Sequence, residues 1–302
     1  MKSTWVAVFV IAAVAFLRIA HVVNSDEPDK APTPAANPMN GKEPGQVRDD
    51  NVLKMKLVWC PPGSFTMGSP ATEVDVAGKH RDDENQVQVK LTNGFWLGKY
   101  EVTQAEWKQV MQTEPWEGQG LTEEGDEFPA TWVCWNDATD FCRTLTEQER
   151  KAGRLSKGWE YKLPTEAQWE YACRAGTETK FSFGDNESKL GDYAWFSNNA
   201  SKVAEKYAHR VGQKKANVWG LCDMHGNVSE FCRDIYTKEL PGGRDPEVKS
   251  DESTSEISFR LVRGGSWMNE ADACRLAFRW GGYPSLNKYH TLGFRLALSF
   301  VR

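Results

Sequence analysis

The chain has 302 residues, a formal net charge of −5 and a sequence pI near 5.7. That charge, with no basic stripe in the spacing of lysine and arginine, argues against a nucleic-acid-binding face. Hydrophobic residues make up 40% and charged residues 26%, which is typical of a globular protein that can bury a sizeable core. The 13 tryptophans and 25 glycines favour a loop-rich fold anchored by large aromatic side chains.

The first 25 residues have the pattern of an export signal. Lys2 precedes an apolar run over residues 5–17, and Arg18 ends that run. Its length suits the apolar region of a signal peptide and falls short of the roughly 20 residues of a spanning helix. Cleavage would follow residues 23–25. The alternative is an uncleaved N-terminal anchor. In both cases we expect the rest to be exported (periplasmic, secreted or anchored facing outside), with membrane contact only through the N-terminus.

Residues 26–50 are rich in proline, alanine, asparagine and charge, so they are predicted to be a disordered linker. A single folded domain is expected over residues 51–302. In it, the apolar run Leu57–Cys60 predicts a short strand. Alternating apolar and polar residues over Val87–Leu91 predict a half-buried strand, and Phe95–Tyr100 is expected to form another.

Three helices have clear start signals. A Thr-x-x-Glu capping box at 103–106 predicts a short helix, because its two side chains satisfy orphan backbone amides reciprocally. Asn136 is expected to cap a second helix over 137–152. A Thr-x-x-Gln box at 165–168 opens a third helix, which ends near Gly176. Short aromatic runs broken by glycine follow, so one α+β domain with a large irregular fraction is predicted.

Seven cysteines in an exported chain allow up to three disulfides with one thiol left over. Cys134–Cys142 and Cys222–Cys232 are close enough in sequence to pair, and buried free thiols are the alternative. The chain has no Cys-x-x-Cys and its five histidines are scattered, so no zinc site is predicted. The cysteines are at positions 60, 134, 142, 173, 222, 232 and 274.

Six collinear motifs resemble those of the formylglycine-generating enzyme, or sulfatase-modifying factor, family. Together they span about residues 52–302. The resemblance implies the family's fold, a C-type-lectin-like α+β domain with little regular secondary structure. The motifs are Trp59–Ser69, Lys99–Gln104, Leu163–Ala172, Gly220–Glu230, Arg263–Trp267 and Gly293–Arg295.

The segment 220–230 is a candidate calcium loop. Calcium prefers six to eight oxygen ligands, and a bent loop with two carboxylates can supply several of them. In the family the matching positions bind a structural calcium, which implies Asp223, the carbonyls of Gly226 and Val228, and Glu230 as ligands here. The alternative is that both carboxylates are ordinary turn and rim residues. A second calcium site of the oxidases is not expected, because Trp195 stands where they have asparagine.

The segment after Arg263 is a candidate cleft, which the resemblance lines with Ser266, Trp267 and Asn269. The family's oxidases hold copper(I) through two cysteines, three and eight residues after this serine. Those positions are Asn269 and Cys274 here, and an amide is a poor ligand for a soft cation. Cys274 is thus the only candidate for a remnant of a catalytic pair, and copper is not expected. Aligned instead on Arg275-x-Ala277-x-Arg279, Cys274 falls at a non-catalytic position. Its alternative role is structural, in a disulfide or the core.

Two functions therefore remain open. The first is a non-oxidase or divergent member that binds a protein or small ligand in the cleft, such as an exported sulfatase. The second is an oxygen-dependent oxidoreductase that converts a sulfatase cysteine to formylglycine, with a further cysteine brought close to Cys274. A sulfoxide synthase of the ergothioneine type is not favoured, because its iron-binding histidine cluster lies in an additional helical domain that this chain has no room for.

Overall fold

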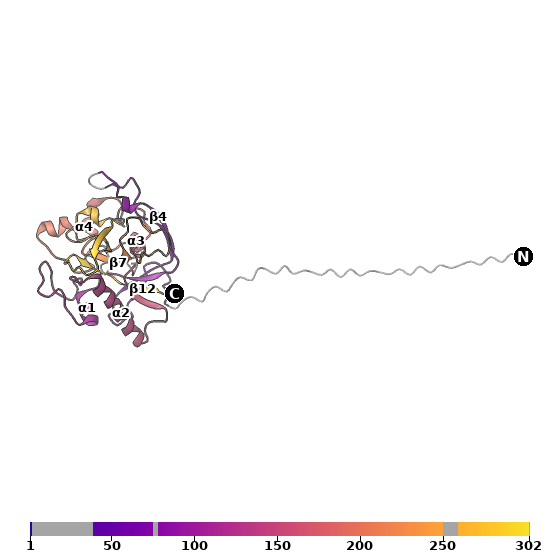
Figure 1. Cartoon of the computed structure of the whole chain (residues 1–302), viewed down its shortest axis with the longest axis horizontal. Coiled ribbons are helices and arrows are strands. Elements are labelled where there is room, and N and C mark those ends of the chain that lie inside the picture. Colours follow the sequence, from indigo (N-terminus) through magenta and orange to yellow (C-terminus); the bar gives the residue numbers. More distant parts are fainter. Residues whose placement is uncertain (2–38, 75–77, 250–258, 302) are drawn as a thin grey trace. The chain divides into compact units, whose positions relative to one another are not determined.

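The computed structural model describes residue 1 and residues 39–74, 78–249 and 259–301, without the side chains of 282–284 (Figure 1). The predicted signal peptide or anchor and most of the linker fall in 2–38, outside that part. No helix in the described ranges is long and apolar enough to cross a membrane. In chain order the elements are β1 (Val47–Arg48), β2 (Leu57–Cys60), β3 (Gly63–Met67), β4 (Val87–Leu91), β5 (Phe95–Gly98), α1 (Gln104–Met111), α2 (Trp135–Lys151), β6 (Trp159–Lys162), α3 (Glu166–Arg174), α4 (Leu190–Tyr193), β7 (Ser229–Ile235), β8 (Gly243–Arg244), β9 (Phe259–Arg263), β10 (Trp280–Pro284), β11 (Leu292–Gly293) and β12 (Ala297–Phe300).

A five-stranded antiparallel sheet, in the order β1-β2-β5-β12-β6, is buried on both faces. Because successive side chains of a strand point to opposite faces, Leu57 and Trp59 join one core cluster while Val58 and Cys60 join another. The first cluster includes Trp107 of α1 and residues of α2, and the second includes residues of α3. The sheet therefore lies between α1 and α2 on one face and α3 on the other.

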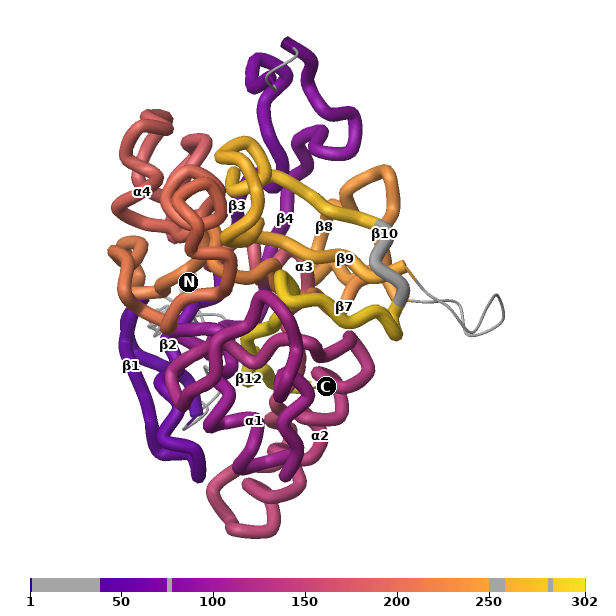
Figure 2. The backbone as a smooth tube through the Cα atoms, turned by 90° about the vertical axis from the view of Figure 1, so that its left-hand side faces the viewer, coloured from indigo at the N-terminus to yellow at the C-terminus, as the bar shows by residue number. Residues whose placement is uncertain are grey.

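Two smaller sheets complete the fold (Figure 2). One has the order β10-β9-β7-β11, in which β11 runs parallel to β7 and the other pairs are antiparallel. The other has the order β3-β4-β8. The tube in Figure 2 shows β7, β9 and β10 running side by side. The loop after β9 carries Ser266 and Asn269 of the candidate cleft.

The helices begin close to where their capping signals predict. Thr103 accepts a hydrogen bond from the Glu106 amide, and the Glu106 carboxylate accepts one from the Thr103 amide at 2.8 Å. The box at 165–168 has the same geometry at the start of α3. The start of α2 differs from its prediction. Its N-cap is Cys134, two residues before the predicted cap, because the side chain of Asp137 takes up the Cys134 amide at 2.9 Å.

The ordered fold begins before the predicted boundary at residue 51. Val47 and Arg48 form β1 against β2. Met39 is buried, and its carbonyl accepts a hydrogen bond of 2.7 Å from the indole of Trp96. The polar composition of residues 39–50 gives no sign that this segment is folded. Backbone pairing and one buried methionine hold it against the domain, and no apolar run is needed.

Buried ion pairs connect α3 to the last third of the chain. Glu166 and Glu170 lie one turn apart on α3 and are both fully buried. Arg279 binds Glu166 through two hydrogen bonds of 2.6 and 3.0 Å, and Arg263 binds Glu170. Since a buried charge is tolerated only when it is paired and hydrogen-bonded, these contacts fix the position of α3 against β9 and the segment before β10.

Side chains of α2 form hydrogen bonds with backbone groups at the outer edge of β6, which is the last strand of the five-stranded sheet. The hydroxyl of Thr146 accepts a hydrogen bond of 2.9 Å from the Tyr161 amide and donates one of 3.4 Å to the Tyr161 carbonyl. Arg150 donates to the carbonyl of Trp159. An edge strand with open backbone groups is a template for pairing with other chains, and α2 removes that template here.

We expect Thr146→Val to destabilise the fold by about 1–3 kcal/mol, because it leaves the buried amide of Tyr161 without an acceptor while it preserves side-chain shape. Thr146→Ser is the matched control. It keeps the hydroxyl and loses one methyl group, which costs about 1 kcal/mol or less. Chemical unfolding of the three proteins measures the difference. A valine variant as stable as the parent would show that the hydroxyl does not support the edge.

Candidate functional site: the cleft after β9 and the acidic loop before β7

A tight turn follows β9 and forms the floor of the cleft. Gly264 and Gly265 have φ angles of +93° and +70°, the left-handed region that favours glycine. A Cβ on Gly265 would lie 2.8 Å from the Cys274 sulfur, so only glycine fits there. The hydroxyl of Ser266 then donates to the Asn269 side-chain oxygen at 2.6 Å, and the Asn269 amide donates to the Ser266 carbonyl at 2.9 Å.

Two of the three predicted cleft residues line a cavity. Ser266 and Asn269 line one of about 230 Å³, with Met268, Phe278 and Trp280 as its apolar walls. A larger cavity of about 590 Å³ adjoins it and shares Asn269, Phe278 and Trp280. The prediction for the third residue, Trp267, differs from the structure. Its side chain is fully buried against Ala200, Ala208 and Val228 and does not line the cleft.

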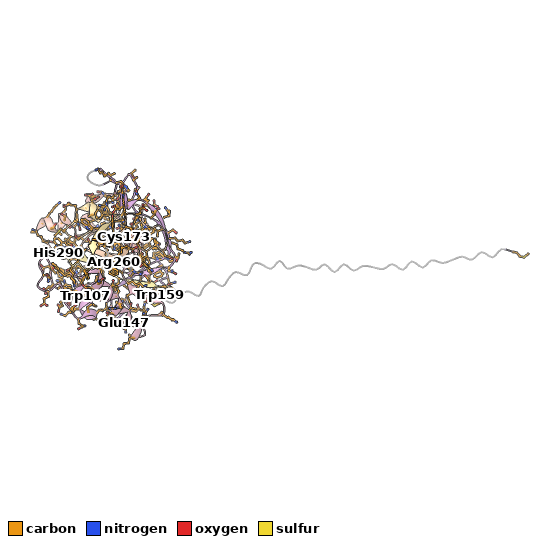
Figure 3. All side chains as sticks on the ribbon, viewed as in Figure 1. Trp107, Glu147, Trp159, Cys173, Arg260 and His290 are labelled. Atoms are coloured by element: carbon orange, nitrogen blue, oxygen red, sulfur yellow. The ribbon has the colours of Figure 1, made fainter. Side chains whose placement is uncertain are left out.

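Cys274 is fully buried behind the turn. Its carbonyl accepts a hydrogen bond of 2.9 Å from His225 Nδ1, and burial raises the pKa of its thiol. All seven cysteines are buried free thiols, including Cys173, which is labelled in Figure 3. Burial raises the pKa of each of them. In this structure none of the seven thiols is exposed at the surface or in the cleft.

The predicted calcium ligands lie on the loop that leads into β7. Asp223 is buried in the left-handed conformation, and its Oδ2 accepts a hydrogen bond of 2.6 Å from the Gly212 amide. Gly226 packs so closely that an added Cβ would lie 2.2 Å from the Trp195 carbonyl oxygen. Val228 is fully buried in the cluster around Trp267.

Glu230 is held by two donors from distant segments. Arg295 donates to both of its oxygens at 2.6 Å, and the indole of Trp169 donates to Oε2 at 2.7 Å. All three side chains are buried. Glu230 thus has the role of a structural anchor between β7, α3 and the closing Gly293–Arg295 motif. The sequence-based prediction of Glu230 as a calcium ligand did not include the donors Arg295 and Trp169, which already occupy its oxygens.

A residue that the sequence analysis missed, Glu101, faces Asp223. Burial, and next the charge of Asp223, raise the pKa of Glu101 well above its usual range. Burial also raises the pKa of Asp223, to about 6, and the contact with Glu101 offsets part of that rise. The Oε1 atom of Glu101 accepts from the side-chain amide of Asn227 at 3.2 Å. Glu101 lies 122 positions before Asp223, so no local spacing could have connected them.

Three buried carboxylates therefore surround one guanidinium, that of Arg295. Two oxygens in this group, Glu101 Oε2 and Asp223 Oδ1, are buried without a conventional donor. Such oxygens are stabilised by a shared proton or by a cation. Among the described residues, no three His, Cys, Asp or Glu side chains converge in a geometry that could hold a metal. A cation here would need backbone carbonyls or water besides these two carboxylates.

The family of the chain follows from comparison with known proteins. The family model for the sulfatase-modifying factor enzyme 1-like domain matches residues 44–300. The chain therefore belongs to this family, as the six motifs predicted. Among solved structures, Treponema denticola variable protein 1 has a TM-score of 0.65 and 27% identity over 81% of this chain and 95% of that one. The predicted α+β fold of the family is confirmed.

Relatives in the family differ in their named activities. A chaperone protein LppX of Paenibacillus barcinonensis is 27% identical, covering 69% of this chain and 80% of the relative. An inactive C-alpha-formylglycine-generating enzyme 2 of Bos taurus is 28% identical, covering 75% and 69%. A formylglycine-generating enzyme of Mus musculus is 25% identical, covering 80% and 74%. Family membership alone thus does not decide whether a chain is an oxidase.

We expect Glu101→Gln and Glu230→Gln to differ sharply in stability. The pKa of Glu101 is raised well above its usual range, so the neutral glutamine side chain should replace it with a change in unfolding free energy below about 1 kcal/mol. Glutamine at 230 removes the carboxylate whose two oxygens Arg295 binds at 2.6 Å and should cost about 3–5 kcal/mol. Denaturant unfolding at neutral pH in a chelating buffer compares them. Equal losses would contradict the protonation assigned to Glu101.

Proposed function

We propose that this protein is a non-oxidase, or divergent, member of the family that binds a protein or small ligand in the cleft beside Ser266 and Asn269. The observation that carries the proposal is the pair of positions where the oxidases have copper-binding cysteines. One holds Asn269, and the other holds Cys274, whose thiol is fully buried. Two-coordinate copper(I) needs two accessible thiolates, and neither position supplies one.

The lining of the cleft supports a ligand with an apolar side chain. Met268 and Trp280 are 45% and 44% exposed at the cleft, beside the amide of Asn269. Apolar walls with a few polar groups are typical of binding sites for side chains of a protein or for small molecules. The name of one relative, a chaperone, favours a protein as the ligand. An exported sulfatase is one such partner.

The alternative proposal is a formylglycine-generating oxidase, which family membership favours. It requires a rearrangement that brings the Cys274 thiol out of the core and next to a second cysteine. The contact between Gly265 and the Cys274 sulfur opposes this, because the turn and the thiol would have to separate.

We expect the purified protein to form no formylglycine when it is incubated with copper, a reductant, oxygen and a sulfatase-type cysteine peptide. Mass spectrometry of the peptide detects the aldehyde, and a member of the family that has both cysteines serves as the positive control. A Cys274→Ala variant distinguishes enzyme turnover from copper chemistry in solution. Aldehyde that depends on Cys274 would overturn the non-oxidase proposal.

We also propose a structural calcium at the loop before β7, with Asp223 and the carbonyls of Gly226 and Val228 among its ligands. The buried, unpaired oxygen of Asp223 supports this assignment. The two donors on Glu230 favour Glu101 in its place as the second carboxylate, because Oε2 of Glu101 is buried without a donor and Glu101 interacts with Asp223. Calcium would then compensate the negative charge of the two carboxylates in place of a proton.

Calcium should raise the melting temperature by a few degrees over that in a chelator, which corresponds to about 1–2 kcal/mol. Glu101→Gln should fold normally and lose this shift, since an amide is a weaker calcium ligand than a carboxylate. Differential scanning fluorimetry with calcium, magnesium or chelator measures the effect. Absence of any shift in the parent protein would remove the calcium proposal, and a shift retained in Glu101→Gln would return the second ligand to Glu230.

Export remains part of the proposal. The apolar run over residues 5–17 and the polar segment after it support an exported chain, either cleaved or anchored at its N-terminus. Mass spectrometry of the protein's N-terminus after expression with the full sequence distinguishes the two forms.

A further inference from the structure

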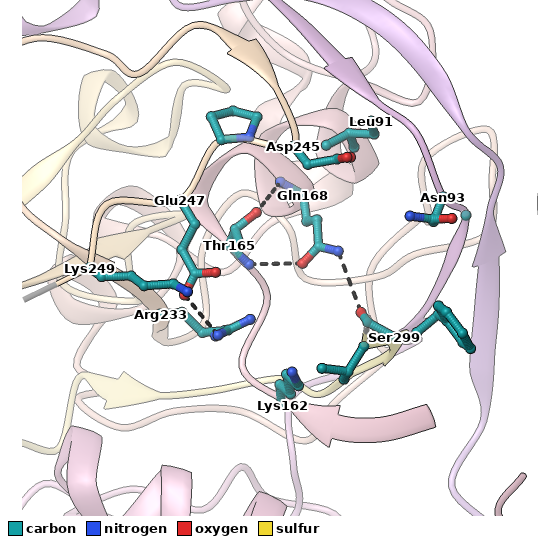
Figure 4. Close-up of a pocket in the computed structure, with 14 residues that line it drawn as sticks. Leu91, Asn93, Lys162, Thr165, Gln168, Arg233, Asp245, Glu247, Lys249 and Ser299 are labelled. Carbon is teal, nitrogen blue, oxygen red and sulfur yellow. Dashed lines mark hydrogen bonds and ion pairs between the residues drawn. The ribbon is translucent and has the colours of Figure 1, made fainter. Parts of the chain in front are cut away.

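A pair of cations, Lys162 and Arg233, lies between two cavities that share no lining residue with the cleft. Lys162 ends β6 and Arg233 belongs to β7 (Figure 4). One cavity, of about 350 Å³, lies beside the start of α3. The other, of about 330 Å³, lies between α2 and β6. Both cavities have Lys162 and Arg233 in their linings, so the two cations form the junction between them.

The acidic groups around this junction only partly neutralise it. Arg233 pairs with Glu247 at 2.7 Å. Lys162 is 3.3 Å from Glu160, which at the same time binds Arg150 at 2.8 Å. Burial, and then the charge of Arg233, lower the pKa of Lys162 in spite of both acids. The ammonium group of Lys162 is therefore short of negative charge, which an anion in the junction would supply.

The cavity beside α3 adds neutral donors and a favourable dipole. Gln168 and Ser299 line it, and the Gln168 side-chain amide donates to the Ser299 hydroxyl at 3.4 Å. Asp245 also lines it, but Thr92 already donates to both of its oxygens. The first amides of α3 are taken by Thr165, Gln168 and Asp234, so the helix contributes only its positive N-terminal dipole.

The cavity between α2 and β6 has an apolar interior. Trp135, Cys142, Tyr161 and Leu163 line it. Its charged residues besides the pair at the junction include Arg143, Glu147 and Arg150. A molecule with an acid group at the junction could thus bury an apolar substituent next to α2.

We propose that Lys162 and Arg233 bind the carboxylate of a small organic acid whose apolar part lies in the cavity between α2 and β6. A planar carboxylate suits this pair, since a guanidinium offers two parallel donors and an ammonium adds a third. The site is separate from the cleft at Ser266 and from the acidic loop, so it does not depend on the function proposed for either.

Three probes that differ in one feature each test the proposal on the full chain by isothermal titration calorimetry. Hexanoate has both features, acetate lacks the apolar part and 1-hexanol lacks the charge. We expect saturable binding of hexanoate, at least tenfold weaker binding of acetate, and no measurable binding of 1-hexanol. Inorganic phosphate should bind no more tightly than acetate. Hexanoate that fails to bind, or that binds no better than acetate or 1-hexanol, would overturn the proposal.

Variants locate the site. Lys162→Met keeps the apolar stem and should weaken hexanoate roughly tenfold or more. Lys151→Met, which removes the same charge at an exposed position outside both cavities, should leave binding unchanged. Thr139→Trp fills the cavity next to α2 and should reduce hexanoate to the affinity of acetate. Equal effects of the two lysine variants would show general charge attraction and overturn the site. Melting curves verify that each variant folds, and the three-probe comparison on the parent protein stands without them.

Discussion

The ion pairs between buried arginines and carboxylates are the constraint on which the rest of the fold depends. Arg263, Arg279 and Arg295 come from the last 40 residues, and their partners lie on α3 and β7. Much of this chain is loop, so few backbone ladders hold its layers together. A desolvated charge whose partner is lost is strongly destabilising, and each pair therefore ties two distant segments to one relative position. The closing Gly-Phe-Arg motif is needed for this reason.

The parts of the fold that were predicted from sequence depend on local chemistry. The capping boxes at 103–106 and 165–168 are complete within four residues, and the alternation over Val87–Leu91 needs only its own strand. The parts that were missed depend on contacts between distant segments. The placement of Met39 depends on its hydrogen bond with Trp96, and the cap of α2 uses the carboxylate of Asp137 instead of a favoured capping residue. Neither can be inferred from composition.

The candidate site shows the same division. Gly-Gly-Ser located the turn, and Ser266 and Asn269 line the cleft beside it. The side chain of Trp267 lies in the core, because a large indole buries more apolar surface there than at the wall of a cleft. Glu101, which precedes α1 and interacts with Asp223, could not be identified from the sequence, because contacts between the charges of remote segments leave no periodic pattern. The Gly-Gly-Ser motif thus predicts the position of the cleft more reliably than it predicts the chemistry of the cleft.

The proposed export would place the seven buried thiols in an oxidising compartment, which has a consequence for the stability of the protein. No disulfide constrains the unfolded chain, so the folded state alone keeps the thiols apart and out of reach of oxidants. Each global opening would release seven thiols at once, several of which could form bonds that do not exist in the native fold. Persistence of the protein would then be governed by its rate of unfolding, because a chain that opens and cross-links wrongly does not return. In such a compartment, slow unfolding would have to take the place of disulfide bonds.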